Sequence, residues 1–205
     1  MLDELRQSFE RRTVPVIVIL NWAGVTPNKL SALALVLAIL SGLNYYSSRL
    51  GFALTFLIIS ALLDALDGPL ARMLNKASLR GDLIDHAFDR FADAAVMAGI
   101  ILSGLVSYEV GLLALIGTML TSYMGTQAQA LGVGRVYGGL SGRADRVAIL
   151  TTATFMQILG YSALNFAMLV LGILGVATTV QRFIIVYEML GDVSEEREEV
   201  VRKVP

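Results

Sequence analysis

Four aspartates stand at the ends of strongly apolar segments, where charge is costly. Asp64 and Asp67 follow the apolar run 51–63, and Asp85 and Asp89 lie in the next apolar segment. One aspartate at the centre of a membrane helix costs about 2.5–3.5 kcal/mol, so something must offset the charge. Spacings of three and four residues put each pair on one face of a helix. Two facing pairs of short carboxylates predict an oxygen cage suited to Mg²⁺ or Mn²⁺.

Small residues and one arginine accompany these carboxylates. Gly68 and Ala71 lie just after the first pair, and Gly81 lies about one helical turn before the second pair. Residues without bulky side chains allow a ligand to approach the backbone closely. Arg72 follows at once, and a guanidinium can bind a phosphate in bidentate fashion. Together these residue types indicate a diphosphate bound through metal ions.

The composition is that of a membrane protein. Of the 205 residues, 56% are hydrophobic and 16% are charged, whereas soluble domains average about 45–50% and about 25%. The absence of cysteine excludes disulfides and thiol catalysis, and a single histidine, His86, argues against a zinc site or a Ser-His-Asp triad. A net charge of −1 gives no general attraction for nucleic acid, so no nucleic-acid partner is expected.

The apolar residues gather in six runs, separated by turn-forming residues. A helix needs about 20 residues to cross the hydrocarbon core, and only helices or closed barrels satisfy the backbone there. We therefore predict an all-α polytopic membrane protein that forms a single domain over residues 1–205. Its six transmembrane helices are expected at 30–47, 51–74, 82–105, 109–131, 144–160 and 163–190.

The two ends of the chain are polar. Leu2, Leu5 and Phe9 recur at helical spacing among charged residues, which predicts a juxtamembrane amphipathic helix over residues 1–13. A signal peptide is the alternative, and the acidic residues of the same stretch disfavour it. Residues 191–205 are rich in charge and are expected to form a helical cytosolic tail.

Basic residues predict the orientation in the cell membrane. With the N-terminus in the cytosol, the inside segments hold most lysines and arginines, and the outer loops hold only Arg49. Cytoplasmic loops of membrane proteins carry this excess of positive charge. Both termini are therefore expected in the cytoplasm, and the aspartates are expected to open to the same side.

The spacing of the acidic segment resembles the signature of the CDP-alcohol phosphotransferase family. The matching pattern is Asp64-x2-Asp67-Gly68-x2-Ala71-Arg72-x8-Gly81-x3-Asp85-x3-Asp89. Six expected helices and the stretch Thr26-Pro27-Asn28 are similar to the family as well. The resemblance implies an enzyme of phospholipid biosynthesis that transfers a phosphatidyl-type group, or its archaetidyl counterpart, to an alcohol and releases CMP. The donor would be a CDP-linked lipid, either CDP-diacylglycerol or CDP-archaeol.

The resemblance also implies roles for individual residues. It assigns two ions of Mg²⁺ or Mn²⁺ to Asp64, Asp67, Asp85 and Asp89, with Asp89 as the catalytic base for the acceptor hydroxyl. It assigns CDP binding to Asn28, Asp64, Gly68, Ala71, Arg72 and Gly81. By the same resemblance, the protein is expected to be a homodimer.

The acceptor alcohol is less directly encoded. Many relatives that use inositol phosphate or glycerol phosphate carry basic residues where this chain has Gly125 and Gln127. Three arginines remain as expected ligands of an acceptor phosphate, namely Arg143, Arg146 and Arg182. If they converge on one pocket, their positive charge favours a phosphorylated acceptor. The stretch 125–146 resembles archaeal members associated with glycerol phosphate. Glycerol phosphate is therefore the favoured acceptor, with inositol phosphate and serine as alternatives.

A transporter is the rival class, because a carboxylate cage in a helical bundle can carry a divalent cation or protons. The later apolar runs hold no partner carboxylate at mid-depth, and no inverted repeat is evident, which disfavours transport. Among the other polar residues, Asp82 is expected to cap a helix. Asp93 is expected to pair with Arg90 or with another helix rather than to bind metal, and His86 is expected to have a structural role.

Overall fold

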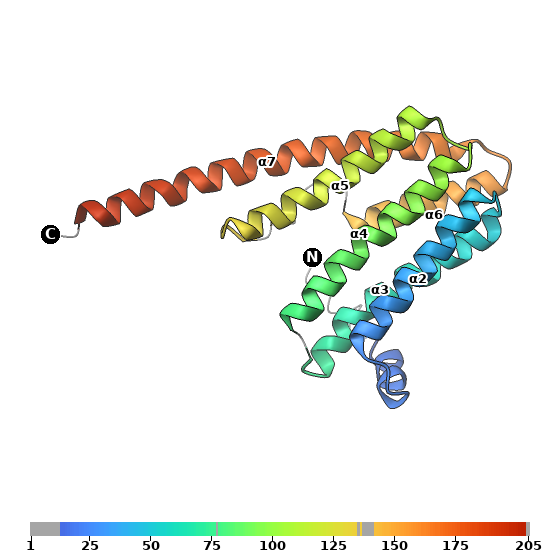
Figure 1. Ribbon diagram of the computed structural model, residues 1–205, viewed down its shortest axis with the longest axis horizontal. Helices are drawn as coiled ribbons and strands as arrows, with labels where there is room; N and C mark the ends of the chain where they lie inside the picture. The colour runs from blue at the N-terminus through green and yellow to red at the C-terminus, as the bar shows by residue number, and fades with distance from the viewer. Residues whose placement is uncertain (1–12, 77, 135, 137–141, 204–205) are drawn as a thin grey trace. The chain divides into compact units, whose positions relative to one another are not determined.

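The computed structural model describes residues 13–76, 78–134, 136 and 142–203, and for residues 192–203 it describes the backbone only. All regular secondary structure in these residues is helical, which confirms the all-α prediction (Figure 1). A short helix, Thr13–Trp22, comes first. The others are α2 (Pro27–Tyr46), α3 (Leu50–Met73), α4 (Leu79–Leu102), α5 (Tyr108–Ala130), α6 (Arg143–Ile158) and α7 (Ala163–Lys203).

Each of the six predicted apolar runs corresponds to one helix from α2 to α7, but not every helix is apolar enough to cross a membrane. Among the described residues, α2, α3 and the part Ala163–Gly191 of α7 have the necessary length and composition. The helix α6 has 16 residues, and α4 carries the acidic residues of the candidate site. The prediction of six crossing helices is therefore supported for three of them.

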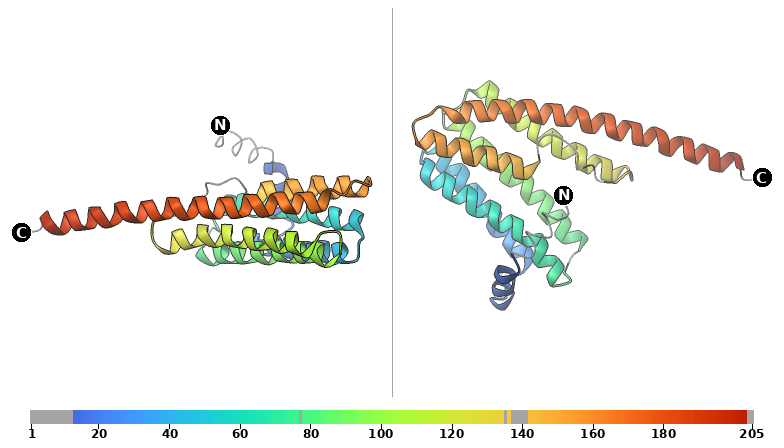
Figure 2. Two further views of the ribbon diagram at one scale, coloured as in Figure 1. Left: turned by 90° about the horizontal axis from the view of Figure 1, so that it is seen from above. Right: turned by 180° about the vertical axis from the view of Figure 1, so that it is seen from behind.

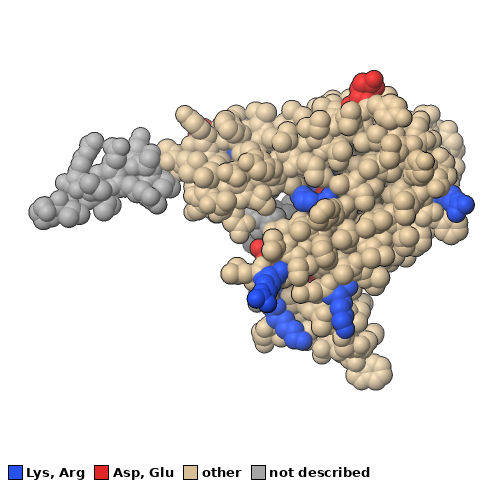
Figure 3. Space-filling view, in the orientation of Figure 1, with Lys and Arg blue, Asp and Glu red and all other residues tan. Residues whose placement is uncertain are grey.

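The surface of the long apolar helices suits contact with lipid. Leu43 of α2, Phe52 of α3 and Ile173 of α7 are more than half exposed. On the face drawn in Figure 3, most side chains are neither acidic nor basic, and several basic side chains gather near the end where α3 stops and α4 begins. This pattern fits the membrane localisation predicted from composition.

The chain divides into two compact units, a first unit of Met1–Ser103 and a second unit of Gly104–Pro205. In the first unit, α2 packs against both α3 and α4. The α2–α4 contact is very close, because a Cβ on Gly42 would overlap the carbonyl of Ala95, and a Cβ on Gly99 would overlap the carbonyl of Gly42. Small residues at helix contacts let backbones approach in this way. As a result, the starts of α2 and α4 and the end of α3 lie at the same end of the unit (Figure 1).

The short helix Thr13–Trp22 packs on this end of the first unit. Its Ile17 is buried with Leu30 of α2 and Leu70 of α3 in one apolar cluster. Other side chains of the helix are exposed, and Trp22 is 91% exposed. The amphipathic helix predicted over residues 1–13 falls almost wholly outside the described residues.

In the second unit, α7 packs against α5 and α6. Glycines again line the α5–α7 contact, where a Cβ on Gly175 would lie 2.7 Å from the carbonyl carbon of Gly117. The hydroxyl of Thr121 donates to the carbonyl of Gly175 at 2.8 Å and ties the same two helices together. Both views in Figure 2 show α7 as one continuous helix, and its backbone stays helical through the polar tail to Lys203.

Candidate metal and nucleotide site

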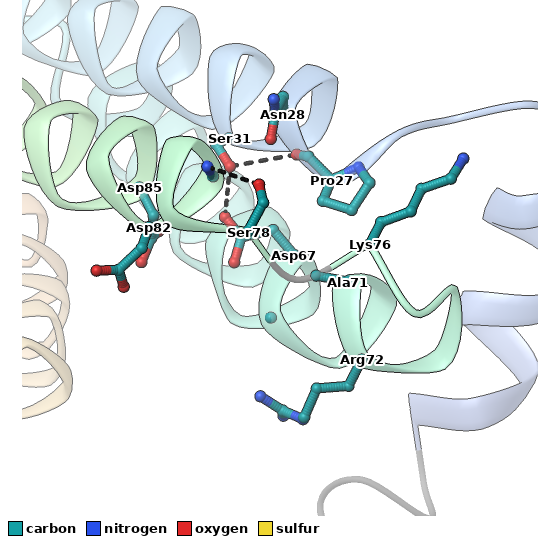
Figure 4. Close-up of a pocket in the computed structure, with 12 residues that line it drawn as sticks. Pro27, Asn28, Ser31, Asp67, Ala71, Arg72, Lys76, Ser78, Asp82 and Asp85 are labelled. Atoms are coloured by element: carbon teal, nitrogen blue, oxygen red, sulfur yellow. Dashed lines mark hydrogen bonds between the residues drawn. The ribbon is translucent and has the colours of Figure 1, made fainter.

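A cavity of about 250 Å³ lies in the first unit, where α2 and α4 begin and α3 ends (Figure 4). Each of the three helices contributes polar or small side chains to its wall. The lining residues are Pro27, Asn28 and Ser31 of α2, Asp67, Gly68, Ala71 and Arg72 of α3, Lys76 and Ser78 of the connection, and Gly81, Asp82 and Asp85 of α4.

The α3 wall carries the first acidic pair. Asp64 and Asp67 are three residues apart near the end of the helix, and Asp67 is 8% exposed. The Ser31 hydroxyl of α2 donates a hydrogen bond to Asp67 Oδ2 at 2.7 Å (Figure 4). A buried carboxylate needs such partners, because an unpaired buried charge is strongly unfavourable. Pro69 stands inside α3 just beyond this pair and offers no backbone N–H to the helix.

The α4 wall begins with a serine cap, and this corrects the prediction for Asp82. Ser78 is the N-cap residue, and its Oγ accepts a hydrogen bond from the Gly81 N–H at 3.1 Å. Asp82 lies within the first turn, where its Oδ1 is 3.2 Å from His86 Nε2. The first turn of α4 therefore lines the cavity with the positive end of a helix dipole, which favours a phosphate group.

Three carboxylates from α3 and α4 converge. Asp64, Asp67 and Asp85 each offer an oxygen, and these oxygens all lie within 4.8 Å of one another. Opposite ligands on one Mg²⁺ are about 4.2 Å apart, twice the usual metal–oxygen distance of about 2.1 Å. Small side-chain rotations would therefore bring all three oxygens onto one ion. A donor set made only of oxygens fits Mg²⁺ or Mn²⁺.

Asp89 joins the site through a second group, in which only the presence of His86 was not expected from the sequence. Ligand atoms of Asp85, His86 and Asp89 also lie within 4.8 Å of one another, so Asp85 belongs to both groups. The structural role predicted for His86 finds support in its contact with Asp82, but its ring is near enough to serve an ion as well. The sequence argument separated His86 from Asp85 by the turn of about 100° between neighbouring helix residues. It did not take into account that the imidazole ring is long enough to reach the same ion.

Arg90 faces two acidic side chains of α4. Its Nη2 lies 3.6 Å from Asp89 Oδ2 and 3.4 Å from Asp93 Oδ2. This confirms the predicted pairing of Asp93 with Arg90. Asp93 does not belong to either carboxylate group described above.

The residues expected to bind CDP gather at the cavity. Asn28, Gly68, Ala71, Arg72 and Gly81 all line it, while Asp64 lies in the carboxylate group beside it. A Cβ on Gly68 would lie 3.4 Å from Arg72 Nη1, and one on Gly81 would lie 3.3 Å from the Ser78 hydroxyl. The two glycines thus keep open space that larger residues would fill.

Five lining residues were not predicted, namely Pro27, Ser31, Lys76, Ser78 and Asp82. Ser31 had a sequence signal, because it follows Asn28 by three residues and therefore shares its helix face. Lys76 follows the end of α3 closely, so its position at the cavity could also have been predicted from the sequence.

The arginines expected to bind the acceptor phosphate all belong to the second unit. Arg143 is the first residue of α6, Arg146 is 4% exposed, and Arg182 Nη1 donates to the carbonyl of Thr121 at 2.7 Å. A Cβ on Gly125 would lie 3.1 Å from Arg182 Nη1, so this arginine lies against the gap that the glycine leaves. Their convergence on one phosphate stays a prediction.

Helices of membrane-spanning character and a carboxylate cluster beside a polar cavity are typical of membrane-embedded, metal-dependent enzymes that act on phosphate compounds. Residues 24–181 match the CDP-alcohol phosphatidyltransferase family, and the chain therefore belongs to that family and is an enzyme.

Two named relatives are similar over nearly their whole length. The archaetidylinositol phosphate synthase of Pyrococcus horikoshii is 32% identical over 188 residues, which cover 92% of this chain and 96% of that protein. The phosphatidylinositol phosphate synthase of Cutibacterium acnes is 28% identical over 207 residues, which cover 91% and 97%.

Solved structures of the phosphatidylinositol phosphate synthase of Mycobacterium tuberculosis share the fold. The complex with manganese and citrate has a TM-score of 0.76 at 26% identity and covers 85% of this chain and 88% of that chain. The complex with bound CDP-DAG has the same TM-score and identity, and covers 86% and 94%.

Proposed function

We propose that this enzyme transfers a phosphatidyl-type group from a CDP-linked lipid to inositol phosphate and releases CMP. The observation that carries the proposal is the cavity in which Asp67 and Asp85 meet the residues expected to bind CDP. The acceptor follows from the relatives, because both the archaeal and the bacterial one are named as inositol phosphate lipid synthases. The earlier preference for glycerol phosphate finds no support among them and is replaced.

The donor lipid binds in the cavity of the first unit. Asp64, Asp67 and Asp85 hold one ion of Mg²⁺ or Mn²⁺, and Asp85 with Asp89 holds a second, in keeping with the two overlapping groups. When bound, such ions neutralise a diphosphate and stabilise the leaving phosphate. Arg72 and the first turn of α4 add positive charge for the diphosphate. Asn28, with Gly68, Ala71 and Gly81, forms the wall for the cytidine.

Asp89 acts as the general base. A carboxylate within hydrogen-bond distance can accept the proton of the acceptor hydroxyl. The acceptor oxygen then forms a bond to the lipid-bearing phosphorus, the bond from that phosphorus to the CMP oxygen breaks, and the proton stays on Asp89. Arg90, which lies 3.6 Å from Asp89 Oδ2, limits the rotation of this carboxylate.

The acceptor phosphate binds to arginines of the second unit. Support comes from Arg182, whose guanidinium lies against Gly125, a position where many relatives carry a basic residue. Arg182 thus supplies the positive charge that a basic residue at position 125 supplies in those relatives. Arg146 is buried, and arginine is the basic residue best suited to buried ion pairs and to phosphate binding. Arg143, in the first turn of the same helix, completes the set.

We further propose that α2–α7 all cross the membrane as one domain, with both termini and the cavity on the cytosolic side, and that the protein is a homodimer. The support for the orientation is the distribution of lysine and arginine along the sequence. The less apolar α4 can cross because Asp85 lines the cavity and the side chains of Asp89 and Asp93 are largely buried, where bound ions would offset their charge.

The test uses the full chain in lipid nanodiscs with a CDP-linked lipid labelled in the cytidine. We expect labelled CMP with inositol phosphate as acceptor, and little with glycerol phosphate, serine or free inositol. Parallel reactions with CDP-diacylglycerol and CDP-archaeol identify the preferred lipid. Faster release with glycerol phosphate would refute the proposed acceptor, and no release with any acceptor and metal would refute the proposed reaction.

A further inference from the structure

Three serine hydroxyls in the described residues cross the contact between α2 and α3. Near the end of the helix pair that lies away from the cavity, Ser41 of α2 donates to the Ala53 carbonyl at 2.8 Å. Ser60 of α3 donates to the Ala34 carbonyl of α2 at 2.7 Å. At the cavity, Ser31 of α2 donates to the carboxylate of Asp67 at 2.7 Å. Two of these bonds thus join a hydroxyl to the backbone, and the third joins it to the acidic site.

The Ser31 bond is short and largely shielded from water. Ser31 is 7% exposed and Asp67 is 8% exposed, so water competes little for either group. A hydroxyl has a single hydrogen to donate. The other acceptor near Ser31 Oγ is the Pro27 carbonyl, which is more distant at 3.2 Å. The shorter distance and the ionised acceptor favour donation to Asp67.

This bond restricts the one torsion that aims the Asp67 carboxylate. The terminal torsion of an aspartate is broad, so the carboxylate plane is not set by the side chain alone. With one oxygen held by Ser31, the plane is fixed, and an oxygen of Asp67 stays within 4.8 Å of those of Asp64 and Asp85. Because Ser31 belongs to α2, this helix also contributes to a group whose acidic members come from α3 and α4.

We propose that Ser31 is a positioning residue, whose hydroxyl holds the Asp67 carboxylate in the orientation that lets it share a metal ion with Asp64 and Asp85. The inference rests on the proposed function, because it takes these carboxylates as the metal site. Residues that orient metal ligands typically contribute 10–100-fold to metal affinity. Loss of the hydroxyl should therefore weaken metal binding by about 10–100-fold.

The experiment measures Mn²⁺ binding to the full chain in nanodiscs by electron paramagnetic resonance, without any substrate. Ser31→Ala removes the hydroxyl, and Ser31→Thr keeps it. Ser41→Ala is the matched control, because it removes a buried serine bond of nearly equal length from the same helix pair. We expect Ser31→Ala to raise the Mn²⁺ dissociation constant by about 10–100-fold, and Ser31→Thr and Ser41→Ala to leave it near the wild-type value.

A second readout separates positioning from general damage. CMP release by Ser31→Ala should shift to higher Mn²⁺ concentration and recover at saturating Mn²⁺, and elution as a single species should confirm folding. Ser31→Cys, which is nearly the same size but a weak donor, keeps the test valid if the alanine variant does not fold.

Unchanged Mn²⁺ affinity in Ser31→Ala, or an equal loss in Ser41→Ala, would overturn the positioning role alone. Wild-type protein that binds no Mn²⁺ would overturn both this role and the proposed metal site. Loss of binding in Asp67→Asn with retention in Ser31→Ala would leave the proposed function intact and refute the inference.

Discussion

The close contact between α2 and α4 predicts that adding a single methyl group at Gly99 will destabilise the protein. In Gly99→Ala, the new Cβ would lie 2.6 Å from the Gly42 carbonyl carbon and 2.7 Å from the Gly42 Cα. Carbon atoms in contact normally lie about 3.5–4.0 Å apart. Because these neighbours are backbone atoms, they cannot rotate aside, and the two helices must separate by roughly 1 Å.

The size of the effect follows from a comparison with a second glycine. Overpacking of a core typically costs about 1–3 kcal/mol. Alanine also has a higher helix propensity than glycine by about 1 kcal/mol, which offsets part of that cost. Gly51→Ala is the matched control, because Gly51 also lies in a helix of the first unit and a Cβ there would meet nothing within 4 Å. The difference between the two variants therefore reports the steric cost.

Thermal melting in detergent measures this difference. For a chain of this length, 1 kcal/mol shifts the melting temperature by about 2–4 °C, so Gly99→Ala should melt roughly 2–12 °C below Gly51→Ala. Gly42 lies about 16 Å along α2 from Ser31 at a rise of about 1.5 Å per residue, so Mn²⁺ binding well below the melting temperature should be little changed. Equal melting temperatures for the two variants would refute the steric argument.

Other perturbations test the roles assigned to single side chains. Asp89→Asn should keep CDP-lipid binding but lose about 10²–10⁴-fold in CMP release; an equal loss of lipid binding, measured by equilibrium dialysis, would contradict a base role. Arg146→Ala should raise the KM for inositol phosphate with a smaller effect on the KM for the CDP-lipid, and an unchanged acceptor KM in steady-state assays would remove Arg146 from the acceptor site. Gly125→Leu should displace Arg182, which a Cβ at this position approaches to 3.1 Å, and should raise the acceptor KM in the same assay. A wild-type acceptor KM in this variant would show that the position of Arg182 is not important for acceptor binding.

The sequence predicted the helices well because the relevant signals are local. Apolar runs and turn residues lie within single segments. Five of the predicted runs became one helix each within about three residues of the expected bounds, and the sixth became α7, which continues through the expected tail to Lys203. The first residue of α4 was harder to predict, because Ser78 and Asp82 both carry side chains that can cap a helix N-terminus. The structure selects Ser78 through its bond with the Gly81 N–H, and sequence proximity does not distinguish the two candidates.

The parts of the site that sequence reasoning missed depend on contacts between distant segments. Asp64, Asp67 and Asp85 were predicted together because their spacing places them on helix faces. The hydrogen bond from Ser31 to Asp67 joins residues 36 positions apart, and the one from Arg182 to Thr121 joins residues 61 positions apart. Such pairs depend on how helices pack, which a periodic pattern in one segment does not reveal.

The residues expected to bind the donor and those expected to bind the acceptor lie in different units of the chain. This separation is why the type of reaction could be predicted from the sequence but the acceptor could not. The acidic signature runs from Asp64 to Asp89 and lies wholly in the first unit, whereas the expected acceptor arginines lie wholly in the second. In the proposed function, the signature binds the CDP-linked donor, whose chemistry is the same whichever alcohol attacks. A phosphorylated acceptor is an anion, and arginine side chains bind phosphate groups through charge-assisted hydrogen bonds. We therefore propose that residues such as Arg182 and Gly125 determine the choice of acceptor, and we expect exchanges at those positions to change the alcohol while leaving metal binding intact.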